Sequence, residues 1–345
     1  MSGTNLNSFP TRLDRLTSLR ALAALFVFGY HLQLYRVVLG GRAPLTYGYA
    51  GVSFFFILSG FVLTWATPDA NQPAAFWRRR FARIYPVYAV LLVVCALLSF
   101  PGAPTYNSIG ALASVLLVQS WSLSPHVIFA VNPPSWSLSD EAFFYLVLPL
   151  LLPALSKLRA TWRTGLLGSW FILTGAVVVY GAHRGGHWSA LAYTFPLVRS
   201  GEFFLGVLLA LELRRGRRLP PMAGVALIAG GLILGRPLSS LGPIPDVWLD
   251  PLWVTVIVLA AQQDITGRPG WILTRPAAVY AGGISYAFYL IHQIVVADLA
   301  QTLGGGVPVA LLALLVATAG AVACHHLIER PVRRLLSAQA GRGST

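Results

Sequence analysis

The sequence predicts an all-α membrane protein, and its composition and apolar segments support this fold class. Of the 345 residues, 56% are hydrophobic and only 10% are charged, whereas a soluble domain carries about 25% charged residues. The mean hydropathy is +0.68. Apolar residues form segments of about 20 residues, the length that an α-helix needs to cross a bilayer. These features exclude a soluble enzyme, a disordered chain and a disulfide-rich secreted domain; the only 2 cysteines, Cys95 and Cys324, are expected to be buried packing residues.

The distribution of the net charge of +14 indicates a membrane topology rather than nucleic-acid binding. Basic residues occur in bursts between apolar segments, as they do in cytoplasmic loops under the positive-inside rule. The bursts begin at Arg12, Arg78, Lys157, Arg214, Arg268 and Arg330. If every burst is cytoplasmic, an even number of spans must separate each burst from the next.

The apolar segments fill these intervals in pairs. They are residues 16–38 and 49–67, 84–100 and 136–155, 164–182 and 192–212, 221–235 and 246–264, and 277–302 and 307–328. A further apolar segment at 108–122 would give an odd number of spans between the burst at Arg78 and the burst at Lys157. Because it is short and ends in polar residues, we expect a re-entrant or irregular segment near 108–135 instead of a span.

The predicted fold is therefore a bundle of about ten transmembrane helices with both termini cytoplasmic. We expect one transmembrane domain over residues 1–345, with its helical core at about 14–330 and a short cytoplasmic tail at 331–345.

The first predicted span contains two ionisable residues, Arg20 and His31, and such residues within a membrane span indicate function. On a helix they lie about 20° apart around the axis and about 16 Å apart along it. An imidazole accepts protons near neutral pH and suits general-base catalysis. The structural alternatives are an arginine at the membrane interface and a histidine bonded to a neighbouring helix.

Arginines and acids elsewhere add further candidates. The cluster of Arg78, Arg79, Arg80 and Arg83 is denser than topology requires, and guanidinium groups bind phosphate well; membrane anchoring is the alternative. Glu141 is the candidate for an acidic partner that orients His31. Asp140 and Glu141 also fit a pair of acids that stabilises a helix N-terminus.

A series of sequence patterns recurs in order along nearly the whole chain. They are LDRLTSLRALAALFVFGYHL (13–32), GVSFFFILSGFVLTW (51–65), FWRRRFARIYPVY (76–88), PSWSLSDEAFFYLVLPLL (134–151), ISYAFYLIHQ (284–293) and IERP (328–331). Together they resemble the membrane-bound acyltransferase-3 family, with its R-x-x-R, W-S-L-x-x-E and S-Y-x-x-Y-L-x-H patterns. Members of that family often carry a further esterase-like domain, and we expect this chain to be the stand-alone form.

The resemblance implies an O-acyltransferase that moves an acyl group, commonly acetyl, from acyl-CoA to a hydroxyl. The acceptor would contain a sugar: a cell-envelope glycan, a glycolipid or a glycosylated natural product. His31 would be the general base with support from Arg20, and Arg80 and Arg83 of the R-x-x-R element would serve donor binding. We add Glu141 to the catalytic candidates and Arg79 to the donor-binding residues.

Acceptor-binding candidates come from two of the patterns. They are Trp136, Ser137, Tyr289 and His292. Tyr289 and His292 share one helix face with Ser285, and a structural bond between helices is the alternative for His292.

The expected partners are acyl-CoA as donor substrate, the acceptor and membrane lipids, with no permanently bound cofactor and no nucleic acid. We expect no metal, because the adjacent His325 and His326 point in different directions on a helix. The expected location is a bacterial cell membrane. A secondary transporter with Arg20, His31 and Glu141 as a relay is the alternative function, and a structural scaffold is a third.

Overall fold

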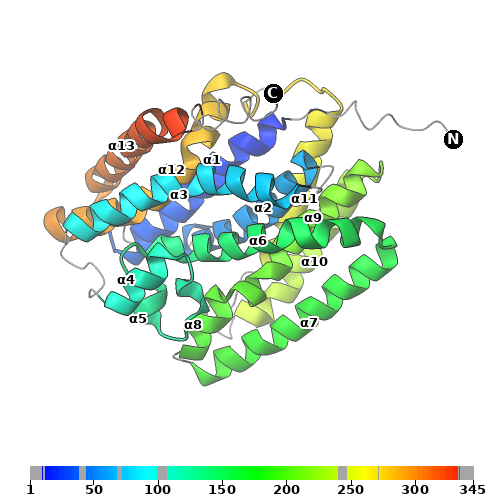
Figure 1. The fold of residues 1–345 in the computed structure, drawn as a ribbon, viewed down its shortest axis with the longest axis horizontal. Coiled ribbons are helices and arrows are strands. Elements are labelled where there is room, and N and C mark those ends of the chain that lie inside the picture. Colours follow the sequence, from blue (N-terminus) through cyan, green and yellow to red (C-terminus); the bar gives the residue numbers. More distant parts are fainter. Residues whose placement is uncertain are drawn as a thin grey trace.

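The computed structural model describes residues 10, 12–38, 44–67, 72–98, 107–185, 187–239, 247–270, 272–332 and 334, and the regular secondary structure of these residues is helical. The long helices are α1 (Asp14–Leu34), α2 (Gly51–Ala66), α3 (Pro73–Leu98), α6 (Trp136–Lys157), α7 (Ala160–Arg184), α9 (Pro196–Arg214), α10 (Pro221–Ser239), α11 (Asp250–Ile265), α12 (Pro276–Leu303) and α13 (Val307–Cys324). The predicted all-α class is confirmed. Figure 1 shows α13 and α7 at opposite edges of the molecule, with α3 and α6 crossing between them.

Within the described residues, 7 segments are long and apolar enough to cross a membrane. They are Leu45–Ala66, Pro73–Leu97, Pro133–Lys157, Ala160–Gly181, Ala190–Arg214, Pro276–Leu303 and Val307–Val332. Helices α1, α10 and α11 coincide with the other predicted spans, and α1 is less apolar because it carries Arg20 and His31. The protein is thus a multi-pass membrane protein.

The segment before α6 is irregular, as predicted. It contains only short helices: α4 (Ser108–Val115), η3 (Gln119–Trp121), α5 (Pro125–Ile128) and η4 (Pro133–Ser135). Leu117 and Val131 have positive φ angles of 55° and 60°, which are unfavourable for bulky side chains and are maintained here by surrounding contacts. One such contact is the hydrogen bond from buried Gln119 to the carbonyl oxygen of Ser135, at 2.9 Å. No element of this segment is long enough to cross a bilayer.

Helix α3 differs from the expectation of an arginine-rich loop before residue 84. It begins at Pro73, so the whole cluster is helical, and Pro86 lies inside the helix rather than in its first turn. Neighbouring helices make an internal proline tolerable in a membrane protein. As a consequence, Arg80 and Arg83, one turn apart, face the interior, whereas Arg79 is exposed.

Glycines allow the central helices to approach closely. A Cβ atom at Gly60 of α2 would lie 1.9 Å from the carbonyl oxygen of Phe203 in α9. A Cβ at Gly282 of α12 would lie 1.8 Å from the carbonyl oxygen of Thr17 in α1. Such small-residue contacts are typical of packed membrane helices. They place α1 against α12 and α2 against α9, and so determine which polar side chains meet in the interior.

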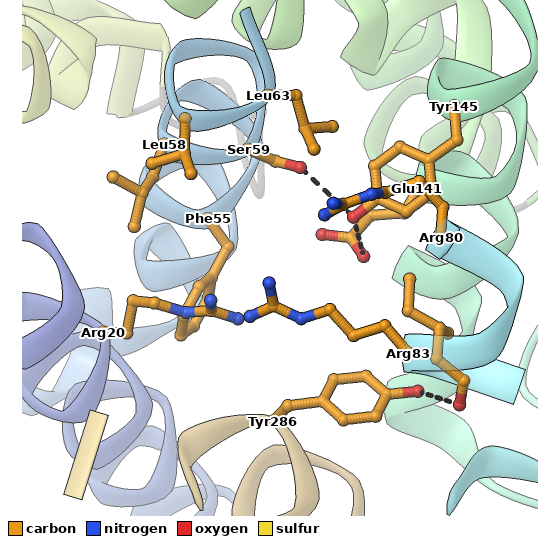
Figure 2. A pocket seen from close by; sticks show the side chains of 12 residues that line it. Arg20, Phe55, Leu58, Ser59, Leu63, Arg80, Arg83, Glu141, Tyr145 and Tyr286 are labelled. Carbon is orange, nitrogen blue, oxygen red and sulfur yellow. Dashed lines mark hydrogen bonds between the residues drawn. The ribbon is translucent and has the colours of Figure 1, made fainter. Parts of the chain in front are cut away.

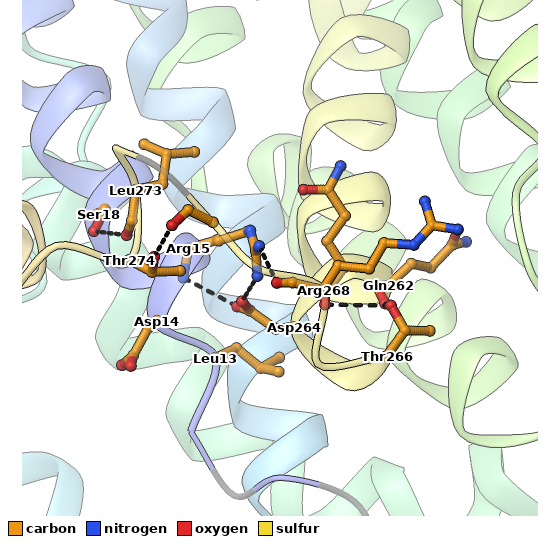
Figure 3. A network of polar contacts seen from close by, with 12 residues as sticks. Leu13, Asp14, Arg15, Ser18, Gln262, Asp264, Thr266, Arg268, Leu273 and Thr274 are labelled. Carbon is orange, nitrogen blue, oxygen red and sulfur yellow. Dashed lines mark hydrogen bonds and ion pairs between the residues drawn. The ribbon is translucent and has the colours of Figure 1, made fainter.

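A polar network attaches the start of α1 to the end of α11 (Figure 3). The Arg15 guanidinium lies 2.5 Å from the Asp264 carboxylate, and the backbone N–H of Arg15 donates to the same carboxylate at 3.0 Å. Arg15 also donates to the carbonyl oxygen of Arg268 at 2.6 Å, and Ser18 donates to that of Leu273 at 2.6 Å. This network sets the position of α1 in the bundle.

Three shorter elements complete the described fold: η2 (Pro44–Ala50), α8 (His187–Thr194) and η5 (Val247–Leu249). After α13 the helix continues through a π-helical turn, η6 (His325–Glu329). The predicted tail at 331–345 lies outside the described residues except for 331, 332 and 334.

Candidate functional site

A small cavity of about 50 Å³ lies between α1, α2, α3, α6 and α12. We call it the arginine cavity. Arg20 and Arg83 extend into it from opposite sides, with Glu141 and Tyr145 above them in Figure 2 and Tyr286 below. The remaining lining residues are Phe55, Leu58, Ser59, Val62, Leu63, Arg80 and Ile84. The cavity therefore unites three arginines and one carboxylate in a largely apolar bundle.

Hydrogen bonds hold the acidic side of the arginine cavity in place. The Tyr145 hydroxyl donates to a carboxylate oxygen of Glu141 at 3.0 Å. Because that proton is used, the Ser59 hydroxyl, 3.3 Å away, is the donor to Tyr145. On the opposite side, the Tyr286 hydroxyl donates to the carbonyl oxygen of Ile84 at 2.9 Å. Figure 2 shows these bonds.

The arginine cavity has an excess of positive charge. Arg20 is repelled by Arg83 and attracted by Glu141, so one carboxylate faces several guanidinium groups. The buried Nε of Arg20 has no hydrogen-bond partner among the residues that the structure describes. Guanidinium groups held in this way suit an anionic or strongly polarised oxygen. No cluster of three His, Cys, Asp or Glu side chains that could hold a metal is found in the described part of the chain.

A much larger cavity of about 780 Å³, here named the vestibule, shares Arg20 and Arg83 with the arginine cavity. The residues that line the vestibule also include the cations Arg12 and Arg330 and two aromatic residues. The aromatic residues are Trp65 and Tyr280. The π-helical turn η6 contributes His325 and Glu329, whose side chains lie 2.9 Å apart. The vestibule is thus basic and partly aromatic.

A third cavity of about 40 Å³, here named the inner cavity, shares the lining residues Arg20 and Glu141 with the arginine cavity. Its wall contains the predicted Ser137 and Tyr289, whose hydroxyls lie 3.0 Å apart, and Ser285 from the same face of α12. The Tyr289 ring is 5.7 Å from the ring of His292. The inner cavity therefore extends from Arg20 toward the histidine at the far end of α1.

His31 and His292 form a direct pair between α1 and α12. The Nδ1 atom of His31 lies 3.1 Å from Nε2 of His292 and 2.9 Å from the carbonyl oxygen of Val27. Glu141, the expected acidic partner of His31, accepts a hydrogen bond from Tyr145 in the arginine cavity, whereas His31 contacts Val27 and His292. The reason is the length of α1: Arg20 and His31 lie about 16 Å apart along the axis, so one carboxylate does not serve both.

Trp136 lies elsewhere than expected for a residue that contacts substrate. It is buried, with its ring 5.0 Å from Tyr193 and 6.2 Å from Phe56, and the Arg199 guanidinium lies 6.0 Å from it. Arg199 is also paired with Glu202, three residues further along α9, at 3.0 Å. These residues form a buried packing cluster.

Several cavity residues were not singled out from the sequence. They are Arg12, Trp65, Tyr145, Tyr280, Tyr286 and Arg330. Tyr145 follows Glu141 by four positions, which places both on one helix face and could have indicated the bond between them. The others are brought together only by the packing of distant helices.

Comparisons with known proteins find a matching family and several bacterial relatives. Residues 13–326 match the acyltransferase-3 family model, described as an acyltransferase domain. The acyltransferase MdmB of Streptomyces mycarofaciens is 32% identical, over 94% of this chain and 92% of the relative. The exopolysaccharide production protein ExoZ of Rhizobium meliloti is 30% identical, over 87% of this chain and 96% of the relative.

The O-acetyltransferase OatA of Staphylococcus aureus is 25% identical over 94% of this chain, which spans 58% of OatA. No solved structure matches the chain significantly. The family match covers nearly all of the described helices and includes Arg20, His31, Glu141 and Tyr289. This chain therefore belongs to the acyltransferase-3 family of membrane enzymes.

Proposed function

We propose that this enzyme moves an acyl group from acyl-CoA to a hydroxyl of a sugar-containing acceptor, with His31 as general base. The observation that carries the proposal is the arrangement along α1. Arg20 lies where the vestibule, the arginine cavity and the inner cavity share their walls, and His31 lies at the far end of the same helix. The names of OatA, an O-acetyltransferase, and of ExoZ, an exopolysaccharide production protein, support acetyl as the acyl group and a glycan or glycoside as acceptor.

The vestibule is the proposed entrance for the donor. Coenzyme A carries several phosphate charges, and the vestibule offers guanidinium groups and aromatic rings in about 780 Å³. Arg80 and Arg83 would act at its inner end, in the arginine cavity. Arg79 is exposed outside the walls of these cavities, so we assign it no contact with the donor and use it as a comparison residue.

The proposed chemistry is a direct acyl transfer. A neutral His31 would accept the proton of the acceptor hydroxyl while the oxygen attacks the thioester carbonyl, a contribution of about 10²–10⁴-fold. Arg20 and Glu141 would hold the donor arm as it passes from the arginine cavity into the inner cavity. Ser137 and Tyr289 line that cavity and supply hydroxyls for polar contacts with substrate.

The proposed topology follows from the charge pattern. Helices α1, α2, α3, α6, α7, α9, α10, α11, α12 and α13 would span the bacterial cell membrane as one domain. Both termini and the vestibule would face the cytoplasm, where acyl-CoA is made. The irregular segment before α6 and His31 would lie toward the opposite side.

The test is a transfer assay with purified protein in detergent micelles. Acetyl-CoA and a panel of glycosides are supplied, and the released thiol and the mass of the acylated glycoside are measured. We expect both products from the wild type and loss of both in His31→Ala with an unchanged unfolding temperature. No thiol release from the wild type, with proton-coupled uptake of solute by vesicles that contain the protein, would instead identify a transporter.

A further inference from the structure

The contact between His31 and His292 restricts where protons can reside on the two rings. His292 is fully buried, and its Nδ1 lies 2.7 Å from the carbonyl oxygen of Tyr289 and 3.3 Å from that of Phe288. Carbonyl oxygens only accept hydrogen bonds, so Nδ1 of His292 must carry a hydrogen. In the neutral ring, Nε2 of His292 is therefore an acceptor.

The same reasoning applies to His31. Its Nδ1 faces two acceptors, the carbonyl oxygen of Val27 at 2.9 Å and Nε2 of His292 at 3.1 Å. A hydrogen on Nδ1 of His31 satisfies both contacts, whereas a lone pair there would face two other lone pairs. The neutral His31 ring consequently has its basic lone pair on Nε2.

We propose that His292 is a positioning residue that fixes His31 in the Nδ1–H tautomer, so that Nε2 of His31 is the base for the acceptor hydroxyl. This inference rests on the proposed function. It reassigns His292 from substrate binding, because both of its ring nitrogens are engaged with α1 and α12.

In this step one proton passes from the acceptor hydroxyl to the leaving thiol by way of His31. The acceptor O–H proton moves to Nε2 of His31 as the oxygen forms a bond to the thioester carbon. The carbon–sulfur bond then breaks, and the sulfur takes the proton from Nε2 and leaves as the thiol of coenzyme A. Meanwhile Nδ1–H of His31 stays on its two acceptors, and His292 stays neutral throughout.

A neutral acceptor suits this location. A carboxylate is a common partner for a catalytic imidazole, but a buried carboxylate within a membrane span carries a large desolvation cost. A second imidazole, itself oriented by the backbone carbonyl oxygens of α12, accepts the Nδ1–H hydrogen bond without a permanent charge. The packing of α1 against α12 brings the two rings within reach.

Two variants of His292 separate positioning from simple packing. In His292→Gln, the side-chain carbonyl oxygen takes the place of Nε2 and still accepts from His31. His292→Leu fills similar volume but offers no acceptor. We expect His292→Gln to retain kcat within about tenfold, and His292→Leu to lose about 10²–10⁴-fold in kcat with an unchanged KM for acetyl-CoA. Equal activity of both variants, at similar unfolding temperatures, would overturn the assignment.

Nitrogen NMR of ¹⁵N-histidine-labelled protein gives a readout that a packing role does not change. The chain has 7 histidines, and the His31→Gln variant identifies the His31 signals by their loss. We expect the unprotonated nitrogen of His31 to be Nε2 in the wild type and in His292→Gln, and a mixture of tautomers in His292→Leu.

The outcomes distinguish this inference from the proposed function. An unprotonated Nδ1 in wild-type His31 would overturn the tautomer assignment even if the enzyme turns over acetyl-CoA. Absence of acyl transfer by the wild type would overturn the proposed function, and with it the catalytic meaning of the tautomer.

Discussion

Gly206 of α9 lies directly against the backbone of Ile57 in α2: a Cβ atom at Gly206 would lie 1.9 Å from the Ile57 carbonyl oxygen. We therefore expect Gly206→Ala to push the two helices apart. Overpacking of a tight core costs about 1–3 kcal/mol, and here the opposing atoms belong to backbone and cannot rotate away. The measurement is the thermal unfolding midpoint in detergent, followed with a thiol-reactive dye, because the thiol of Cys95 is buried in the folded protein.

Gly168→Ala is the matched control for this prediction. Gly168 lies on α7, where a Cβ would meet no atom within 4 Å. Alanine favours a helix over glycine by about 1 kcal/mol, so the control is expected to unfold at an equal or slightly higher temperature. If Gly206→Ala matched the control, the close contact between α2 and α9 would be wrong.

The ion pair between Arg15 and Asp264 gives a second stability prediction. Its side chains are only 5% and 7% exposed, and removal of one partner from a buried pair costs about 3–5 kcal/mol. Asp264→Ala also removes the acceptor for the backbone N–H of Arg15. We expect a clear drop in the unfolding midpoint.

The exposed pair between Arg12 and Asp14 provides the comparison for the buried pair. Its side chains are 68% and 44% exposed, and such surface pairs contribute about 0–1 kcal/mol. Asp14→Asn should leave the unfolding midpoint nearly unchanged. A similar small effect of Asp264→Ala would contradict the anchoring of α1 to α11.

Variants of Arg83 and Arg79, which lie on the same helix, distinguish specific donor binding from an effect of the overall positive charge. Arg83→Gln removes a cation shared by the arginine cavity and the vestibule, so the KM for acetyl-CoA should rise about tenfold or more, in line with a lost charged hydrogen bond. Arg79→Gln removes an exposed cation and should leave KM nearly unchanged. Equal effects of both variants would indicate that only the overall positive charge matters.

Glu141 and Tyr145 provide a test of the carboxylate in the arginine cavity. Tyr145→Phe removes the hydroxyl that donates to Glu141 but keeps the carboxylate opposite Arg20, so we expect a modest loss of kcat/KM. Glu141→Gln leaves the arginines without a counter-charge, and we expect a loss of about 10²-fold or more. The assay is thiol release from acetyl-CoA; a larger loss in Tyr145→Phe than in Glu141→Gln would argue against a role for the charge.

The fold class followed from hydropathy because long apolar segments leave few alternatives to membrane helices. The irregular segment before α6 could also be predicted, since an odd number of spans would conflict with the arginine pattern. The start of α3 could not, because the helix extends thirteen residues before Pro86 through a polar stretch.

In the candidate site, the shared helix face of Arg20 and His31 could be inferred from the sequence, but the partners of these two residues on other helices could not. The spacing along α1 gives the position of Arg20 relative to His31, but it does not give the distance from either residue to a side chain on another helix. The contact of His31 with His292 arises from the packing of α1 against α12. Such a contact joins residues 261 positions apart, and no local pattern records it.

The position of Arg20 and His31 on one uninterrupted helix makes α1 a molecular ruler. The helix holds the two groups about 16 Å apart, so under the proposed function a donor whose phosphates bind near the arginines brings its thioester to the imidazole only if the arm between them spans that length. In that proposal the extended arm of coenzyme A supplies the reach, and a truncated thioester lacking the arm would not connect the arginines with the imidazole. The proposed function therefore predicts that the geometry of a single helix selects for the full-length carrier.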